Sequence, residues 1–343
     1  MSLLSEFDLK EFREIILPAE EEIIRVWGSK ESTHPVVSVV CISYNHENYI
    51  EDSIKGFLLQ RTNFPFEILI HDDASTDRTA EIIKKYKSLY PNLIKCVLQS
   101  ENKYRVDRQY PFRCMFSMAR GQFIAICEGD DFYICPNKLQ KNVDQMNGDS
   151  SLSMLFGPAK KIYDNSSKVE VLNAYQKDEI SRINTEWVLK KGGGFYPTCT
   201  LMIRSSIIRN LPKWFSMHYT GDYPLGILAS QKGKIGYCSE IMSCYRVHPT
   251  SVTHTIERDK EKVKKSVLET YKMNICFIDT INEEGVTTPQ MNRFLLAKED
   301  YLYYSKILDN GLKIMALAGV CKIRFSLYFK FRLICKFVYR LFR

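Results

Sequence analysis

Short apolar runs alternate with amphipathic stretches along the first half of the chain. Four runs are aliphatic or β-branched and carry almost no charge, which is typical of buried strands. These runs lie at 36–42, 66–70, 93–98 and 123–127. Between them, apolar residues recur at helical spacing, at 48–60, 78–90 and 112–120. Strands that alternate with helices predict βαβ units and a mostly parallel sheet covered on both faces, an α/β fold.

The second half of the chain has a more mixed pattern. Further strands are predicted at 151–156, 160–164, 198–204, 234–238 and 241–247. Helices are predicted at 136–146, 185–191 and 221–231, and then at 257–282, 289–310 and 312–341. We therefore expect a helical lead-in over 1–33, a core domain over 34–255 and a C-terminal helical extension over 256–343.

The strand predicted at 123–127 ends in a turn with three carboxylates, Glu128, Asp130 and Asp131. Ligands of open α/β sheets bind beyond the carboxyl ends of the strands. Clustered acids repel one another, so a divalent cation is the simplest group to offset them. The alternative is that Asp130 and Asp131 only cap the helix that follows.

Polar residues also follow the first two strands, as Ser43-Tyr44-Asn45 and as Asp72-Asp73. In a parallel sheet these turns share an edge with the acidic turn, which is the placement that a nucleotide site needs. Each turn taken alone is equally explained as an ordinary turn or a helix cap. The chain has no G-x-G-x-x-G after the first strand and no G-x-x-x-x-G-K-[ST], which argues against dinucleotide-binding and P-loop folds.

The composition also indicates a cellular compartment. The apolar and charged fractions, 45% and 26%, are those of a globular protein. The eleven cysteines show no C-x-x-C pair, and most lie inside apolar runs, as buried free thiols do. Without a secretory signal before them, they indicate a reducing cytoplasm.

The excess positive charge is confined to the end of the chain. The net charge is +8, and residues 312–343 hold eight lysines and arginines and no acid. The even charge of the remainder gives no basic binding face, so no nucleic-acid partner is expected. Aromatic and aliphatic residues alternate with the basic ones, which predicts a peripheral contact with the inner face of the cell membrane. The alternative is a helix that packs on the domain with its basic face in solvent.

Three segments together resemble the family 2 glycosyltransferases of the GT-A fold. They are VVSVVCISYN at 36–45, EILIHDDASTD at 67–77 and GQFIAICEGDDFY at 121–133, and the resemblance extends over 36–247. The bacterial enzymes of surface-polysaccharide assembly are the most similar. The resemblance implies a GT-A-type mixed, mostly parallel sheet flanked by helices. It also implies a metal-dependent hexosyl- or hexosaminyltransferase that takes a nucleotide-sugar donor, with a UDP-sugar favoured, and inverts the anomeric centre.

The resemblance assigns donor and metal contacts to particular residues. Glu128-Gly129-Asp130 corresponds to the family's D-x-D signature, with glutamate in place of the first aspartate. Asp130 is then the metal ligand, for Mn²⁺ or Mg²⁺. His248, in the segment Tyr245-Arg-Val-His248, is a second candidate for the metal. The residues expected to contact the donor nucleotide are Ser43, Tyr44, Asn45, Asp73, Glu128, Asp131 and Arg246.

The resemblance also assigns the catalytic and acceptor positions. Asp222 corresponds to the base that removes the proton from the attacking acceptor hydroxyl. Its alternative role is to cap the helix predicted from 221. Gly194 and Thr198 lie in the glycine-rich loop expected to frame the acceptor, a saccharide or a lipid-linked saccharide.

Two other functions are compatible with parts of this pattern. A sugar-nucleotidyltransferase has a related sheet, but it usually carries a glycine-rich basic loop after the first strand, where this chain has Ser43-Tyr-Asn-His46. A catalytically inactive sugar- or nucleotide-binding scaffold would not need both Asp130 and Asp222. A glycosyltransferase of cell-surface polysaccharide synthesis is therefore the function that the sequence favours.

Overall fold

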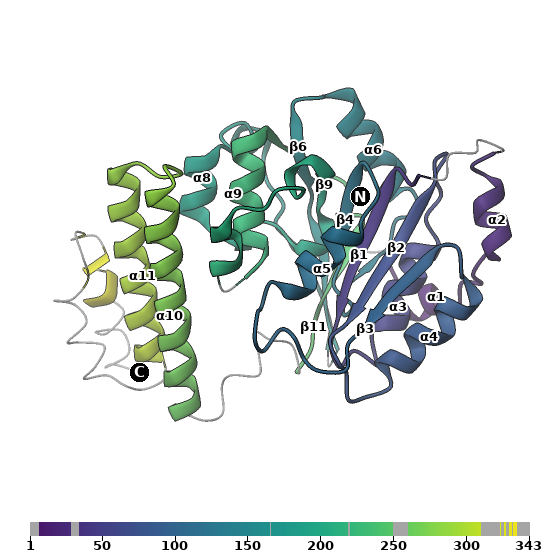
Figure 1. Ribbon diagram of the computed structural model, residues 1–343, viewed down its shortest axis with the longest axis horizontal. Coiled ribbons are helices and arrows are strands. Elements are labelled where there is room, and N and C mark those ends of the chain that lie inside the picture. The colour runs from purple at the N-terminus through teal and green to yellow at the C-terminus, as the bar shows by residue number, and fades with distance from the viewer. Residues whose placement is uncertain are drawn as a thin grey trace. The chain divides into compact units, whose positions relative to one another are not determined.

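The computed structural model describes residues 7–28, 34–164, 166–218, 220–249 and 260–309, with 323, 326, 329, 330 and 332–334. Two compact units make up the chain (Figure 1). The first comprises Met1–Leu211 and Thr220–Val247, and the second comprises Pro212–Tyr219 and His248–Arg343. The segment before residue 34 belongs to the first unit.

The first unit is built on a seven-stranded sheet with the order β10-β6-β9-β4-β1-β2-β3. Its strands are β1 (Val37–Ser43), β2 (Phe66–Asp72), β3 (Ile94–Leu98), β4 (Phe123–Ile126), β6 (Leu152–Phe156), β9 (Met202–Arg204) and β10 (Lys234–Tyr237). Only β9 runs antiparallel to its neighbours, β4 and β6. The sheet is therefore mixed but mostly parallel, as predicted.

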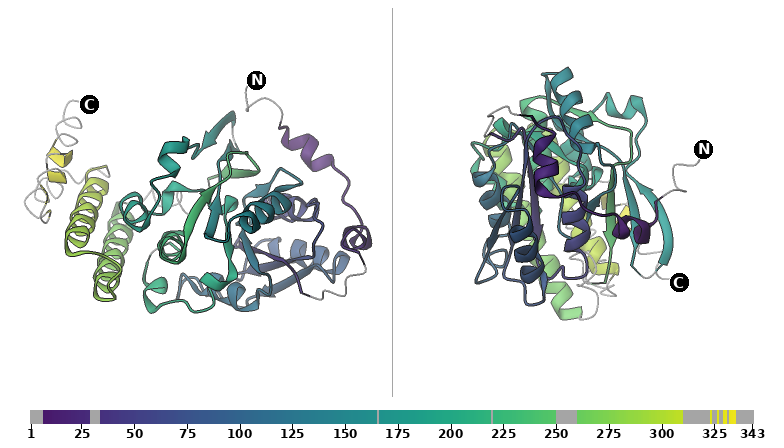
Figure 2. Two further views of the ribbon diagram at one scale, coloured as in Figure 1. Left: turned by 90° about the horizontal axis from the view of Figure 1, so that it is seen from above. Right: turned by 90° about the vertical axis from the view of Figure 1, so that its right-hand side faces the viewer.

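Helices flank this sheet and bury it (Figure 2). They are α3 (Ile50–Leu58), α4 (Thr79–Leu89), α5 (Tyr110–Met118), α6 (Lys138–Gly148), α8 (Thr185–Lys191) and α9 (Asp222–Lys232), with the short α7 (Lys177–Ile180) and the 3₁₀ turns η1 (Gly193–Phe195), η2 (Thr198–Thr200) and η3 (Ser205–Ile207). Strands β1, β2 and β4 read as continuous apolar runs because helices cover both of their faces. Accordingly, Val39, Ile68 and Ala125 are fully buried.

A second, four-stranded sheet has the order β5-β11-β7-β8. Its strands are β5 (Phe132–Tyr133), β7 (Ala159–Tyr163), β8 (Ser166–Leu172) and β11 (Ser243–Val247). The sequence pattern did not predict β5 or β8. The first has only two residues, and the second begins with three exposed polar residues, so neither shows an apolar run.

Two short helices, α1 (Leu9–Glu14) and α2 (Glu20–Arg25), precede the sheets. Phe12 of α1 is buried, and its ring centroid lies 5.1 Å from that of Phe132 in β5. The N-terminal segment is thereby anchored in an apolar cluster with Phe132 and Cys244 of the second sheet.

The second unit contains the long helices α10 (Lys260–Glu283) and α11 (Pro289–Asp309), together with the turn η4 (Lys213–Met217). Trp214 of η4 packs against Phe277 of α10. The helix predicted at 312–341 lies outside the described residues except for a few positions. Of those, Ile323, Phe329 and Leu333 are buried in a cluster with Ala297 of α11. Among the helices that the structure describes, none is both long and apolar enough for a membrane crossing.

Candidate functional site

Three polar turns meet at one edge of the large sheet. Strands β4, β1 and β2 are adjacent and parallel, so their carboxyl ends lie together. Ser43 at the end of β1 pairs in register with Asp72 at the end of β2, and Val40 pairs with Ile126 at the end of β4. The prediction that these turns share an edge is confirmed.

Gly129 lets the acidic turn pack tightly against the turn after β1. Its backbone N–H donates to the carbonyl of Ile42 at 2.9 Å. A Cβ atom at this position would lie 2.9 Å from His46 Nδ1 and 3.0 Å from Ser43 Oγ. Only glycine permits this approach, so the turn is fixed by contacts on both sides.

The carboxylates of Glu128, Asp130 and Asp131 converge on one another. Each offers an oxygen, and these atoms all lie within 4.8 Å of one another. Asp130 Oδ2 is also 3.8 Å from Nε2 of His46. Oxygen-rich clusters of this size suit Mg²⁺ and Mn²⁺, so these residues could hold such an ion.

The electrostatics of the cluster favour a bound cation. Burial, followed by the charges of Asp130 and Asp222, raises the pKa of Glu128 to about 8. Burial and the charges of Asp130 and Glu128 raise the pKa of Asp131 well above its usual range. Carboxyl groups placed in this way resist ionisation unless a positive charge joins them.

Asp131 has one satisfied and one unsatisfied oxygen. Its Oδ1 accepts from the backbone N–H of Arg246 at 2.8 Å, while its Oδ2 is buried and accepts from no N–H or O–H group of the described residues. The thiol of Cys199, a weak donor, also interacts with this carboxylate. A buried carboxylate oxygen without a partner is costly, and a cation or a ligand hydroxyl would satisfy it. The chemistry of these donors therefore fits a divalent ion.

The alternative in which Asp130 and Asp131 only cap the following helix is wrong. Helix α6 begins at Lys138, and Asn137 is its N-cap residue. The two aspartates lie six or more residues before the helix and cannot reach its first free N–H groups. They are therefore available for the cluster at the sheet edge.

The turn after β2 is satisfied within the protein. Asp73 is buried, and its carboxylate accepts from the backbone N–H groups of Lys103 at 3.0 Å and Tyr104 at 2.9 Å. Asp72 accepts from the backbone N–H of Ser75 at 3.1 Å and also from its hydroxyl. These bonds organise the loop that follows β3. The contact of Asp73 with a nucleobase stays a prediction.

The turn after β1 is hydrogen-bonded to the turn after β2. Asn45 has a positive φ of 55°, and its Oδ1 accepts from the backbone N–H of Thr76 at 2.8 Å. Ser43 is buried, and its Oγ has no hydrogen-bond partner, while Tyr44 is half-buried. Asn45 thus joins the turn after β1 to the turn after β2. Contact of Ser43 and Tyr44 with the donor nucleotide stays a prediction.

The structure gives Arg246 a different partner from the diphosphate that the resemblance implied. Its guanidinium is 1% exposed, and Nη2 donates to Asp52 Oδ2 at 2.8 Å. The rings of Tyr49 and Phe132 lie 4.9 and 5.1 Å from it. Pairing with a buried carboxylate turns the side chain into the protein, so its role here is structural. His248 is buried and follows β11 directly as the first residue of its segment of the second unit; its role as a ligand stays a prediction.

Asp222 is the first residue of helix α9, and Gly221 is the N-cap. Its Oδ1 accepts from the N–H of Tyr223 at 2.8 Å, and the hydroxyl of Tyr196 donates to its backbone carbonyl. The charge of Asp222 contributes to the raised pKa of Glu128. The Asp222 carboxylate thus lies at the N-terminus of α9, and its charge acts on Glu128 of the acidic cluster.

The glycine-rich loop lies against Asp222. A Cβ atom at Gly193 would be 2.8 Å from Asp222 Oδ2. The carbonyl of the exposed Gly194 accepts from Asn173 Nδ2 at 3.1 Å, and Thr198 begins η2. Contact of Gly194 and Thr198 with an acceptor stays a prediction.

The sequence did not identify three residues of this site. His46 lies in the turn that was singled out, but it received no role. Gly193 and Tyr196 lie in the glycine-rich loop that was expected to frame the acceptor, but nothing in their local pattern shows that they touch Asp222.

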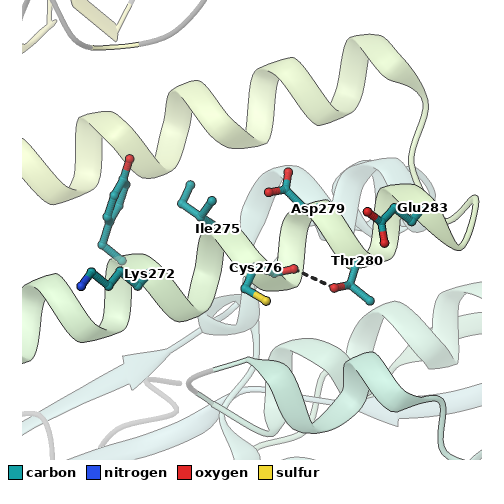
Figure 3. A pocket seen from close by; sticks show the side chains of 7 residues that line it. Lys272, Ile275, Cys276, Asp279, Thr280 and Glu283 are labelled. Carbon is teal, nitrogen blue, oxygen red and sulfur yellow. Dashed lines mark hydrogen bonds between the residues drawn. The ribbon is translucent and has the colours of Figure 1, made fainter.

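A separate concavity lies along helix α10 (Figure 3). It encloses about 570 Å³, and its lining residues, among them Lys272, Asp279 and Glu283, all come from this one helix. Thr280 Oγ1 donates to the carbonyl of Cys276 within the helix. A surface walled by one helix brings no groups together from different elements, so the sheet edge is the stronger candidate site.

Comparison with known proteins matches the chain to a family model and to several relatives. The sequence profile of glycosyl transferase family 2 matches residues 38–211, about half of the chain. An uncharacterized protein of Mycobacterium tuberculosis is 31% identical over 231 residues, which span 66% of this chain and 63% of that protein. The putative glycosyltransferase EpsE of Bacillus subtilis is 25% identical over 80% of this chain and 88% of its own length.

Two solved structures show the same fold at low sequence identity. Staphylococcus aureus TarS 1–349 in complex with UDP-GlcNAc has a TM-score of 0.50 at 16% identity, covering 82% of this chain and 87% of TarS. The mannosyltransferase PcManGT of Pyrobaculum calidifontis, in complex with GDP-Man and Mn²⁺, has a TM-score of 0.53 at 13% identity, covering 97% and 86%. The predicted GT-A architecture is confirmed.

Proposed function

This chain belongs to glycosyl transferase family 2, and we propose that it transfers one sugar from a nucleoside-diphosphate donor to a saccharide or lipid-linked saccharide acceptor, with inversion. The observation that carries the proposal is the convergence of Glu128, Asp130 and Asp131 at the edge of a parallel sheet, with Asp222 in electrostatic contact with Glu128. An anionic donor needs a cation to bind beside such acids.

The acidic cluster would hold a divalent cation, Mn²⁺ or Mg²⁺, with Asp130 as the principal ligand. Such an ion offsets the charge that develops on a leaving diphosphate. The turn Ser43–Asn45 and the neighbouring Asp73 would contact the nucleobase of the donor. Glu128 and Asp131 complete the donor site from the same turn.

Asp222 would act as the base. An acceptor hydroxyl attacks the anomeric carbon as the bond to the diphosphate breaks, and the Asp222 carboxylate takes the hydroxyl proton. Gly193 lies against this carboxylate without a side chain, which leaves the carboxylate in its present position. The loop with Gly194 and Thr198 would frame the acceptor.

The test is donor turnover with and without Mn²⁺, on the wild type and on Asp222→Asn. We expect metal-dependent turnover that falls about 10²- to 10⁴-fold in the variant, the usual contribution of a general base. Asp144→Asn, an exposed position on α6, is the matched control. An inactive wild type across a panel of donors and acceptors would favour a binding scaffold, and a fully active Asp222→Asn would remove the base.

The nucleotide is the least constrained part of the proposal. UDP is favoured by the resemblance at Tyr44 and Asp73, and the solved neighbours were crystallised with UDP-GlcNAc in one case and GDP-Man in the other. A thermal-shift panel of UDP, GDP and dTDP with Mn²⁺ tests this preference. A larger shift with GDP than with UDP would contradict it.

We also propose that residues 312–343 contact an anionic membrane at the inner face of the cell, near a lipid-linked acceptor. The support is the concentration of eight basic residues there. Co-sedimentation with phosphatidylglycerol vesicles measures it. Replacing Lys336, Arg340 and Arg343 with glutamine is expected to weaken binding, and unchanged binding would refute the contact.

A further inference from the structure

Helix α1 is connected to the acidic turn through an ion pair between Arg13, which is 49% exposed, and the buried Asp52. Arg13 of α1 donates to Asp52 of α3 through Nε at 2.8 Å and Nη2 at 2.7 Å. Asp52 is 5% exposed, and its Oδ2 also accepts from Arg246 Nη2 at 2.8 Å. One carboxylate therefore joins two guanidinium groups that lie 233 residues apart in the chain.

The second guanidinium leads directly to the site. The backbone N–H of Arg246 donates to Asp131 Oδ1 at 2.8 Å. Phe132, the residue after Asp131, packs its ring 5.1 Å from the Arg246 guanidinium. Arg246 thus orients the Asp131 carboxylate through its backbone N–H and packs on the next residue of the turn through its guanidinium.

Helix α3 holds the same turn through its backbone. Ser53, beside Asp52, has its Oγ 2.6 Å from the carbonyl of Asp131 and 3.0 Å from the carbonyl of Gly129. Asp52 and Ser53 therefore fix both the side chain and the main chain of the acidic turn. Arg13 completes the coordination of Asp52 from outside.

Helix α1 is docked by more than this ion pair. Phe12 packs on Phe132, and Lys55 of α3 donates to the carbonyl of Arg13. A six-residue helix has little stability alone, so its place depends on these contacts. A segment docked only for stability would not need a bidentate bond to a carboxylate that is shared with the active site.

We propose that Arg13 and Asp52 are positioning residues for the acidic turn, and that the N-terminal segment with α1 is part of the active-site scaffold. Arg13 neutralises and orients Asp52, Asp52 fixes Arg246, and Arg246 holds Asp131 in the cluster. The inference rests on the proposed metal site at this turn. It predicts that cation affinity depends on a residue that touches neither metal nor donor.

The test is Mn²⁺ binding to the full chain, followed by electron paramagnetic resonance of free Mn²⁺ well below each variant's unfolding temperature. Arg13→Met and Asp52→Asn are each expected to raise the dissociation constant about 3- to 10-fold, at or below the effect of losing a direct partner of a metal ligand. Arg25→Met, an exposed arginine of α2, is the matched control and should bind as the wild type does. The Arg13→Met and Asp52→Asn pair should be non-additive in a double-mutant cycle.

The outcomes separate the inference from the proposed function. If the wild type binds Mn²⁺ and both folded variants bind within twofold of it, the positioning role is refuted while the metal site stands. If the wild type binds no Mn²⁺, both are refuted. Should Arg13→Met fail to fold, Arg13→Lys decides the question, because it keeps the charge and loses the two-pronged bond. An intermediate loss of affinity in Arg13→Lys supports the role, and wild-type affinity refutes it.

Discussion

Two acidic turns lie side by side in this fold and differ in how their charges are satisfied. Asp72-Asp73 follows β2, and Asp130-Asp131 follows β4, with only β1 between these strands. Asp73 accepts two backbone N–H groups from the loop after β3. Asp131 keeps a buried oxygen, beside Glu128 and Asp130, that accepts from no N–H or O–H group in the part of the chain that the structure describes.

The difference shows that a pair of aspartates at a strand end has no fixed meaning. Where backbone N–H groups surround a carboxylate, the charge organises the protein itself. Where other carboxylates surround it, the charge needs an external cation. The turn after β2 therefore uses its carboxylates to hold a loop, whereas the turn after β4 leaves a carboxylate oxygen open to a ligand.

The largest expected effect comes from Asp130→Asn. We expect Mn²⁺ binding to be lost and donor turnover to fall about 10³-fold, or about 4 kcal/mol of transition-state stabilisation, because the principal ligand is gone. The free energy of unfolding of the metal-free protein should not decrease, since a repelling charge is removed. Kinetics measure donor turnover, and urea unfolding measures the free energy of unfolding. Wild-type Mn²⁺ affinity in the variant would contradict the difference between the two acidic turns.

Asp73→Ala is expected to give the opposite result. Two backbone N–H groups, of Lys103 and Tyr104, lose their acceptor, which should lower the free energy of unfolding by about 2 kcal/mol. Mn²⁺ binding should persist, because Asp73 is not in the cluster. Urea unfolding and Mn²⁺ titration are the measurements. Asp144→Ala, which is exposed, controls for the loss of one carboxylate.

Gly193→Ala extends the comparison to Asp222. The new methyl group would lie 2.8 Å from Asp222 Oδ2, so the carboxylate must move. We expect kcat to fall about tenfold, or about 1.4 kcal/mol, with an unchanged Tm, because the end of a side chain shifts cheaply. Gly148→Ala, at the exposed end of α6, is the matched control, since no atom lies within 4 Å of its added Cβ. Equal kcat values in both variants would contradict the assignment.

The smallest effect concerns pH. The pKa of Glu128 is raised to about 8, so the folded protein retains a proton that the unfolded chain releases near its ordinary value. Stability from this group is full below about 4.5 and is lost as pH rises through about 8.

Unfolding of metal-free wild type and Glu128→Gln across this pH range measures the effect. The variant should lose less stability than the wild type, and saturating Mn²⁺ should reduce the loss in the wild type. Glu81→Gln, 73% exposed on α4, is the control. Identical pH slopes in wild type and Glu128→Gln would show that Glu128 is not held in a like-charged environment.

The sequence by itself determined the order of the elements and the residues at the strand ends. Continuous apolar runs identify β1, β2 and β4, because parallel strands are buried on both faces. The acids then follow at known positions, and the parallel arrangement brings them to one edge. The mostly parallel α/β sheet and the location of the candidate site were therefore predictable from local patterns, and the GT-A fold from the family resemblance of three segments.

Only the tertiary structure decided which of those carboxylates have hydrogen-bond donors within the protein and which keep an oxygen available for a ligand. Asp73 meets its N–H partners 30 residues away, and Asp52 meets Arg246 across 194 residues. No local pattern shows such contacts, so the pairing of Arg246 with Asp52, the role of Arg13 and the contact of Gly193 with Asp222 could not be predicted. Hydrogen bonds of this kind depend on the packing of distant elements, and that packing leaves Asp131 with an oxygen to offer.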